Sequence, residues 1–348
     1  MRTYLPWKKL RCRRRVGVRR CTVPRIPDGT LASVIYLYPS SAHAERGERM
    51  GGSGFIVAVQ SATINDPYRK HVYAVTNRHV IRDGQSPVIR LNTWEGSFDI
   101  LDLSPLNWSN HPEGDDIAIA PLSLDRGIHR AWWVDSERLV TKEHMKAWDF
   151  GPGSDVMMVG RFAQHEGEQQ NRPTARFGNI AMQGWDPIFD SNRRPQDSIL
   201  VEVRSIPGYS GSPVFVALEQ SKRTEEYEWE RESKFLLLGI DWCHIPNYDQ
   251  VQERGADGTW HAVPNLRARS NTGMMGVVPA WKLKELLDSP EFMNARSAKD
   301  REWLAERSGQ SFGADDATSG AISQQSNDSS TTGSTNRQGE AEANGSPS

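Results

Sequence analysis

One serine in the sequence has surroundings that suit nucleophilic chemistry. Ser210 lies in "SIPGYSGSPVF" (Ser205 to Phe215), close to Gly208 and Gly211, with a proline on each flank of the motif. A serine hydroxyl becomes a good nucleophile only when a base takes its proton, and that base is usually a histidine oriented by an acid. The motif therefore requires a suitable histidine and acid elsewhere in the chain.

Among nine histidines, His79 is distinguished by its place at the end of the strand-like run "VYAVTN". Asp116 begins the apolar run of "GDDIAIAPL". A histidine or an aspartate alone at such a place is more often structural than catalytic. The order His79, Asp116, Ser210 along the chain, each where a strand meets a loop, is the order of the chymotrypsin-type triad. The three residues together therefore predict a catalytic triad.

The elements that must hold these residues are mainly strands. Short apolar runs rich in Val, Ile, Phe and Tyr recur between turn residues, for example "GFIVAV", "SILVEV" and "FLLLGIDW". This pattern predicts an all-β sandwich or barrel protein. One helix is expected after Pro279, where Ala280, Leu283, Leu286 and Leu287 follow helical spacing.

The two ends of the chain differ from this pattern. Residues 1–25 contain ten Arg or Lys and no acid, and we predict that residues 1–28 form a disordered basic arm that could bind an anionic partner. Residues 306–348 are polar and too poor in apolar side chains to bury a core, which predicts a disordered tail. The net charge of −2 argues against a general nucleic-acid binder.

The cysteine count and the apolar runs indicate in which cellular compartment the protein works. Three cysteines cannot build a disulfide framework, so we expect free thiols and a cytoplasmic protein. No apolar run is long enough to span a bilayer. The segment "LASVIYLYPSSAHA" mimics a signal peptide, which would make the protein secreted or periplasmic. We favour a first strand there, because the apolar part is short.

Several motifs in order resemble the trypsin/chymotrypsin-like serine peptidases over residues 30–285. They are "GGSGFIV", "VTNRHVI", "DDIAIAPL", "GSDVMMVGRF", the serine motif and "GMMGVVPAWKL". The resemblance implies two six-stranded Greek-key β-barrels, an N-terminal one over 29–125 and a C-terminal one with a helix over 126–305. The serine motif is most similar to that of bacterial glutamyl endopeptidase-like enzymes, with Tyr209 in place of their asparagine.

The same resemblance implies a serine endopeptidase without a cofactor, acting on a protein or peptide. Ser210 would attack the carbonyl, His79 would move the proton and Asp116 would orient the imidazole. The N–H groups of Gly208 and Ser210 would form the oxyanion hole.

Substrate contacts are implied for Arg204, Ser205, Asp241 and Trp242. Asp241 could recognise a basic side chain at P1, the residue before the scissile bond, or Arg204 could pair with Asp241 and neutralise the pocket. Arg204 could equally point to solvent. An acidic P1 residue would be repelled by Asp241.

Other readings of the same residues are possible. A catalytically silent barrel that binds peptides or partners is the alternative function. An α/β-hydrolase is disfavoured because Ser212 stands where that motif needs glycine. The segment "HPEGDD" (His111 to Asp116) is acidic, but it lacks the ligand spacing of a calcium loop, and we expect no metal.

Overall fold

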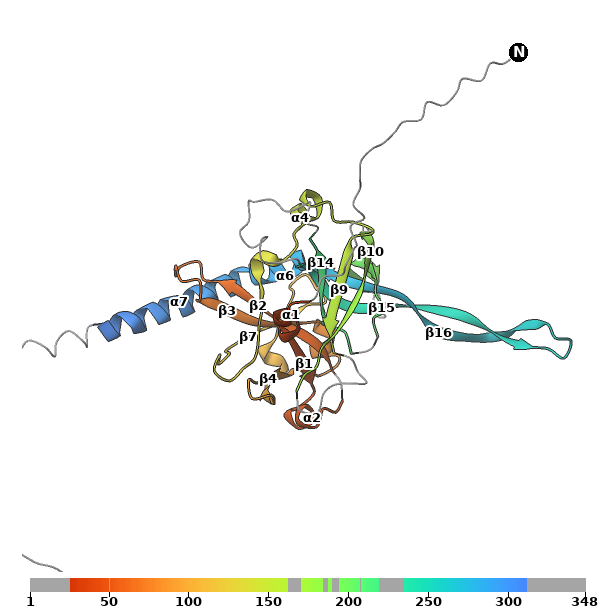
Figure 1. The fold of residues 1–348 in the computed structure, drawn as a ribbon, viewed down its shortest axis with the longest axis horizontal. Coiled ribbons are helices and arrows are strands. Elements are labelled where there is room, and N and C mark those ends of the chain that lie inside the picture. Colours follow the sequence, from red (N-terminus) through yellow and green to blue (C-terminus); the bar gives the residue numbers. More distant parts are fainter. Residues whose placement is uncertain are drawn as a thin grey trace, which may run out of the picture. The chain divides into compact units, whose positions relative to one another are not determined.

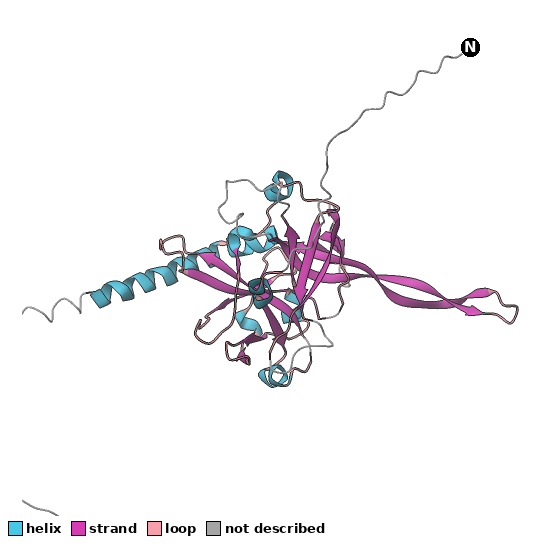
Figure 2. Cartoon of the chain, viewed as in Figure 1, coloured by secondary structure: helices cyan, strands magenta, loops and turns pink. Residues whose placement is uncertain are grey.

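The computed structural model describes residues 26–49, 51–161, 170–183, 187–189, 194–206, 208–218 and 235–311, with side chains up to 308 in the last range. Most of the predicted basic arm (1–25) and of the polar tail (312–348) lies outside the described residues. Strands dominate the described part, as Figure 2 shows, and the expected all-β class is confirmed.

The first half of the chain forms one sheet, whose strand order is β5-β4-β1-β2-β3-β7-β6 with β8 paired to β2. The strands are β1 (Val34–Tyr38), β2 (Gly52–Gln60), β3 (Lys70–Thr76), β4 (Val88–Asn92), β5 (Phe98–Leu101), β6 (Ser109–Asn110), β7 (Ala118–Leu122) and β8 (Val134–Asp135). The hydrogen-bonded path from β5 to β6 does not close into a ring. Since β8 belongs to this sheet, the first half extends past the expected boundary at residue 125.

The second half is a closed barrel with the strand order β10-β13-β16-β15-β14-β9. Its strands are β9 (Asp155–Gly160), β10 (Thr174–Gln183), β13 (Ile199–Glu202), β14 (Pro213–Ala217), β15 (Phe235–Arg254) and β16 (Trp260–Pro279). A small two-stranded hairpin, β11 (Ile188–Phe189) with β12 (Pro195–Gln196), stands outside the barrel. The expected six-stranded barrel is thus confirmed for the half that carries Ser210.

Three apolar clusters account for the packing of the two halves. One fills the first sheet and includes Ile35, Ile56 and Ile89, and another fills the barrel. The third joins residues of both halves, among them Phe55 and Phe215, so the halves share a continuous core. Burial of large apolar side chains at such a junction stabilises a fixed geometry between the segments that carry the candidate site.

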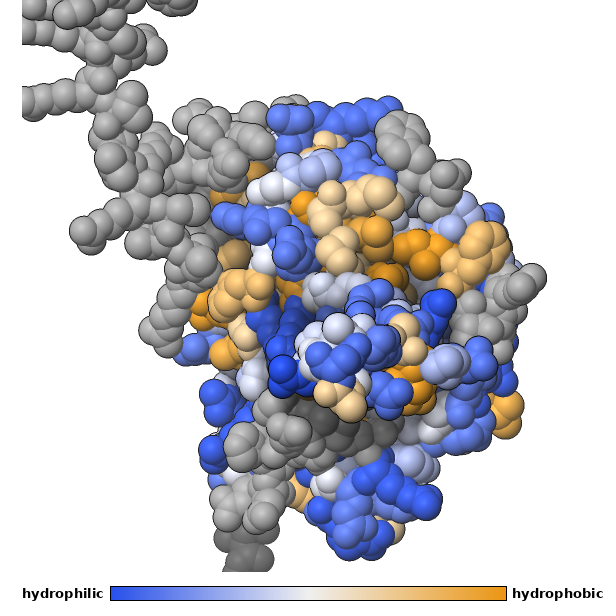
Figure 3. Space-filling view, turned by 90° about the vertical axis from the view of Figure 1, so that its right-hand side faces the viewer, coloured by the Kyte–Doolittle hydropathy of each residue, from blue (hydrophilic) through white to orange (hydrophobic). Residues whose placement is uncertain are grey.

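The β15–β16 hairpin extends well beyond the barrel. Its barrel part is buried, whereas the part from Asn247 outward is mostly exposed. It projects to the right in Figure 1 and toward the viewer in Figure 3, where its surface is mainly hydrophilic. The turn at its end contains Gly258 at φ +83°. The Asp-Gly pair in "GADGT" is the local sequence signal for this hairpin turn.

Short helices connect the strands, and two longer ones end the described chain. In chain order they are α1 (Asp28–Ala32), α2 (Ser41–Arg46), α3 (Arg78–Arg82), the 3₁₀ helices η1 (Pro105–Asn107) and η2 (Ser136–Arg138), α4 (Lys142–Ala147), α6 (Ala280–Leu287) and α7 (Pro290–Ser311). The expected helix after Pro279 is α6, which buries Leu283, Leu286 and Leu287.

Helix α7 was not expected, and it continues to Ser311, past the predicted start of the tail at 306. Its sequence "DREWLAERS" is rich in good helix formers, which favour a helix even with few apolar residues. The part from Arg301 onward belongs to a separate unit, Arg301–Ser348, in which the Arg307 guanidinium lies 4.7 Å from the centre of the Trp303 ring. No described helix is long and apolar enough to cross a membrane.

Candidate active site

His79 and Asp116 are brought together by the pairing of β3 with β7. The register places Thr76, at the end of β3, opposite Ala118, at the start of β7. His79 follows β3 in the one-turn helix α3, and Asp116 lies two residues before the start of β7. Adjacent antiparallel strands therefore deliver both side chains to one end of the sheet.

Asp116 holds His79 by two hydrogen bonds. The ring nitrogen Nδ1 of His79 lies 2.6 Å from Asp116 Oδ2, and the backbone N–H of His79 donates to Oδ1 at 2.9 Å. Asn77 supports the loop by donating to the carbonyl of Asp116 at 2.9 Å. This geometry places the proton of the neutral imidazole on Nδ1, which leaves Nε2 as a base.

The charges near His79 favour its protonated form. Burial alone would lower the pKa of His79. The hydrogen bond and the charge of Asp116 outweigh burial, and Asp83 and Asp241 add to them, so the pKa of His79 is raised above its ordinary value. A histidine of this kind can take a proton from a nearby hydroxyl and hold it during a reaction.

Ser210 lies in a tight loop before β14. Gly208 and Gly211 have φ of +98° and +88°, a backbone region that favours glycine. The carbonyl of Ser210 accepts from the backbone of Ser53 at 2.8 Å, and Ser53 Oγ donates to the carbonyl of Gly208 at 3.0 Å. A Cβ on Gly211 would lie 2.0 Å from the carbonyl oxygen of Ser53. The loop is thus fixed by the first half of the chain, as well as by its own turn.

Tyr209 anchors this loop from inside the barrel. Its side chain is buried, and its hydroxyl lies 2.6 Å from Thr174 Oγ1 and accepts from Arg176 Nε at 3.0 Å. The tyrosine therefore does more than supply backbone at the position before the serine.

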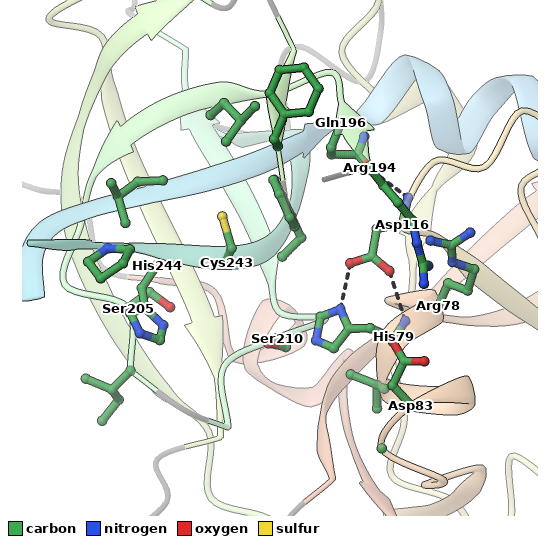
Figure 4. A pocket seen from close by; sticks show the side chains of 18 of the residues that line it. Arg78, His79, Asp83, Asp116, Arg194, Gln196, Ser205, Ser210, Cys243 and His244 are labelled. Carbon is green, nitrogen blue, oxygen red and sulfur yellow. Dashed lines mark hydrogen bonds and ion pairs between the residues drawn. The ribbon is translucent and has the colours of Figure 1, made fainter. Parts of the chain in front are cut away.

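One cleft contains His79, Asp116, Gly208 and Ser210. Figure 4 shows Ser210 beside the imidazole of His79, with Asp116 at a different edge of the ring. Within the described residues, the N–H groups of Gly208 and Ser210 donate to no protein acceptor. Two such donors at the nucleophile could stabilise an oxyanion.

The four predicted substrate-binding residues are placed differently from one another. Ser205 and Trp242 line the cleft, whereas Asp241 is buried behind it and is only 1% exposed. Asp241 Oδ2 accepts from Ser205 Oγ at 2.7 Å. Arg204 is exposed and outside the cleft lining, and among the described residues it makes no ion pair with Asp241. The structure therefore does not bring Arg204 to Asp241.

Burial is the main influence on the Asp241 carboxyl. It raises the pKa of Asp241 to about 7, against smaller opposing effects of the Ser205 hydrogen bond and of His79. The backbone of Asp241 also supports the serine loop, since its N–H donates to Ser212 at 2.9 Å and its carbonyl accepts from Gly211 at 2.8 Å. Asp241 thus lies beneath the cleft floor and beside the nucleophile loop.

Several cleft residues were missed from the sequence. They include three arginines, a histidine, a glutamine and two apolar residues of the small hairpin: Arg78, Arg194, Arg269, His244, Gln196, Ile188 and Phe189. Arg78 could have been found because it adjoins His79. The others come from segments whose proximity depends on the folded barrel and on the β15–β16 hairpin.

A cluster at "HPEGDD" has a geometry that could hold a metal. The side chains of His111, Glu113 and Asp115 offer ligand atoms that all lie within 4.8 Å of one another. The ammonium of Lys282 lies 3.1 Å from Asp115 Oδ2 and 3.3 Å from Glu113 Oε2. A cationic side chain of this protein therefore already stands against two of the three ligands.

No family model matches the sequence, and no curated protein matches it. Among solved structures, a crystal structure of Deg5 is similar at a TM-score of 0.37 and 17% identity, over 62% of this chain and 81% of that chain. These comparisons do not assign a chemistry to the cleft, so any function must be argued from the contacts of this chain's own residues.

Proposed function

We propose that this protein is a serine endopeptidase of the chymotrypsin type, with the triad His79, Asp116 and Ser210. The observation that carries the proposal is the His79 imidazole, held by Asp116 at 2.6 Å and facing Ser210 in the same cleft. The motif resemblance to glutamyl endopeptidase-like enzymes supports the same chemistry, and the closed barrel around Ser210 supports the fold it needs.

In this mechanism the Ser210 hydroxyl attacks the carbonyl of a peptide bond while Nε2 of His79 takes its proton. Asp116 keeps the ring in the required tautomer and stabilises the imidazolium. The oxyanion that forms accepts hydrogen bonds from the N–H groups of Gly208 and Ser210. His79 then gives its proton to the leaving amine, and an acyl-enzyme remains on Ser210. Water then attacks the acyl carbonyl while His79 takes its proton, and His79 returns that proton to Ser210 Oγ as the acyl–oxygen bond breaks and the acid product leaves.

The charges of the cleft lining favour substrates with acidic side chains. Arg78, Arg194 and Arg269 line it, while Asp83 is the one carboxylate outside the triad among the described lining residues. Asp241, placed behind Ser205, is not positioned to meet a P1 side chain directly. Opposite charge between cleft and substrate favours association and specificity. A peptide library that varies one position at a time tests this preference.

A fluorophosphonate probe tests the proposed nucleophile. We expect one adduct on the native protein, located at Ser210 by peptide mapping, and none on Ser210→Ala or on heat-denatured protein. Ser212→Ala is a matched control, since Ser212 is a buried serine of the same loop. Labelling of the native protein should increase with pH through the pKa of His79, because only the neutral imidazole acts as a base. A native protein without any adduct would favour the silent, peptide-binding barrel instead.

A further inference from the structure

Gln196 makes an unusual pair of contacts with the loop that carries the triad acid. Its Oε1 accepts from the backbone N–H of Asp116 at 2.6 Å, and its Nε2 donates to Asp115 Oδ1 at 2.7 Å. The residue is only 4% exposed. Because a backbone N–H can only donate and a carboxylate accepts, the two contacts need one acceptor and one donor on the same side chain. An amide supplies both.

The other oxygen of Asp115 is neutralised from a third part of the chain. Lys282, on helix α6, lies 3.1 Å from Asp115 Oδ2 and also faces Glu113, Glu285 and Asp197 at 3.3 to 3.8 Å. Burial would lower the pKa of Lys282, but the hydrogen bonds and charges of Asp115 and its neighbours outweigh burial and raise it. Lys282 therefore stays charged, and removing it would leave the buried carboxylate of Asp115 facing exposed carboxylates without a cation between them.

Gln196 belongs to a wall of the cleft. It ends the β11–β12 hairpin, in which Ile188 pairs with Gln196 and Phe189 with Pro195, and all four residues line the cleft. Gln196 lies 80 residues from Asp116 in the chain and comes from the half that carries Ser210. The triad acid is therefore tied to the opposite half through one amide side chain.

We propose that Gln196 is a positioning residue for the triad: it fixes the Asp115–Asp116 backbone from the cleft wall, with Lys282 neutralising Asp115, so that the carboxylate of Asp116 meets His79. Its role in catalysis depends on the proposed function, whereas its effect on His79 does not. Asp116 is otherwise held at its carbonyl by Asn77 and at its carboxylate by His79. Neither of these two contacts involves the backbone N–H of Asp116. Loss of Gln196 therefore leaves that N–H without its hydrogen bond and lets the loop move there.

The first test replaces Gln196 by leucine, which keeps the size and charge. It removes the hydrogen bonds to Asp115 and Asp116 and a longer one, 3.1 Å, from Nε2 to the carbonyl of Asp197. The carboxylate of Asp116 then holds the ring less closely, so the pKa of His79, measured by NMR, should fall toward its ordinary value. The other charges that face His79, Asp83 and Asp241, are unchanged by the substitution. The rate of fluorophosphonate labelling should fall about 100-fold, as for a small displacement of a reacting group. Urea unfolding shows whether the variant is folded.

A charge swap separates positioning from simple loss of packing. Gln196→Glu alone sets two carboxylates against each other at Asp115, and should slow labelling at least as much as leucine does. Adding Asp115→Asn reverses donor and acceptor at the same net charge, and should recover labelling at least about 10-fold. Gln60→Leu is the matched control, since Gln60 is half-buried and holds two backbone carbonyls away from the cleft.

The outcomes divide clearly. Folded Gln196→Leu with native labelling and an unchanged pKa of His79 would overturn the proposal, as would a swap that recovers nothing. If the native protein does not label at all, the proposed function fails, but the NMR comparison still tests whether Gln196 positions Asp116. If Gln196→Leu does not fold, the single and double swap variants decide.

Discussion

Two buried aspartates lie close to His79, and their surroundings differ. Asp116 receives hydrogen bonds from the ring and the backbone of His79, at 2.6 and 2.9 Å. Asp241 receives one from Ser205, and among the described residues its Oδ1 has no partner. Burial is the largest effect on the Asp241 carboxyl and raises its pKa to about 7, and the Ser205 hydrogen bond offsets burial only in part. Asp116 bonds directly to His79, whereas the carboxyl of Asp241 bonds to Ser205, and this separates an orienting acid from a structural one.

The largest expected effect follows from breaking the Asp116 contact. Asp116→Asn keeps the shape but no longer requires the proton on Nδ1 of His79. We expect fluorophosphonate labelling to slow by about 10⁴-fold, the size known for this change in a chymotrypsin-type triad. A loss below about 10-fold would mean that Asp116 does not orient His79.

Asp241→Asn should affect stability, with a clear dependence on pH. The pKa of Asp241 is about 7 in the folded protein and 3.8 ordinarily, so the native protein loses stability as pH rises from about 4 to about 7. The asparagine variant does not titrate and should be more stable than the native protein at pH 8, by at most about 4 kcal/mol. Urea unfolding of both proteins at pH 4 and pH 8 measures the difference. An equal difference at the two pH values would contradict the burial argument.

Ser205→Ala removes the hydrogen bond that Ser205 Oγ donates to Asp241 Oδ2. The hydrogen bond lowers the pKa of Asp241, so its loss should raise that pKa above about 7. We expect a stability loss of about 1 kcal/mol, typical of one buried hydrogen bond. The pH at which the Asp241 carboxyl titrates, followed by NMR, checks the direction. Ser198→Ala, which removes a donor and acceptor near Trp242, serves as the comparison.

The smallest effect is expected for Arg204→Ala. Since Arg204 is exposed and makes no contact with Asp241, stability should change by less than about 0.5 kcal/mol. The titration of Asp241 and the preference at P1 should also stay the same. A shift of P1 preference toward basic residues would instead indicate that Arg204 acts on the pocket.

The sequence predicts the parts of the molecule that depend on local order. His79, Asp116 and Ser210 could be selected because each stands where an apolar run meets a loop and because their order fits a triad, and the all-β class follows from the strand pattern. The role of Gln196 could not be predicted, because its amide meets the Asp116 loop only after the two halves pack. The contact of Lys282 with Asp115 could not be predicted for the same reason. Helix α6 was expected from the sequence, but nothing in the sequence shows which residues its lysine meets.

Two elements of the structure were not predicted from the sequence, and each has a physical reason. The outer part of the β15–β16 hairpin lacks a buried face, so its strands show little of the apolar alternation that identifies a strand. Helix α7 is mostly polar, and helix propensity alone favours it. In "HPEGDD" the contact of Asp115 and Glu113 with Lys282 could not be predicted, because the lysine lies far along the chain.

The long hairpin offers a place to modify the protein without opening its barrel. Closure of the barrel uses the pairing of β13 with β16 from Ile199 to Glu202, and the inner pairing of β15 with β16. The pairs beyond Tyr248 and Arg269, two residues that still line the cleft, take no part in closure, and the contact of Asn271 with the Ser205 carbonyl lies inside them. The hairpin beyond this pair is therefore a natural insertion site. Its length could vary between related proteins, and a reporter or affinity module could replace it, at little cost to the cleft.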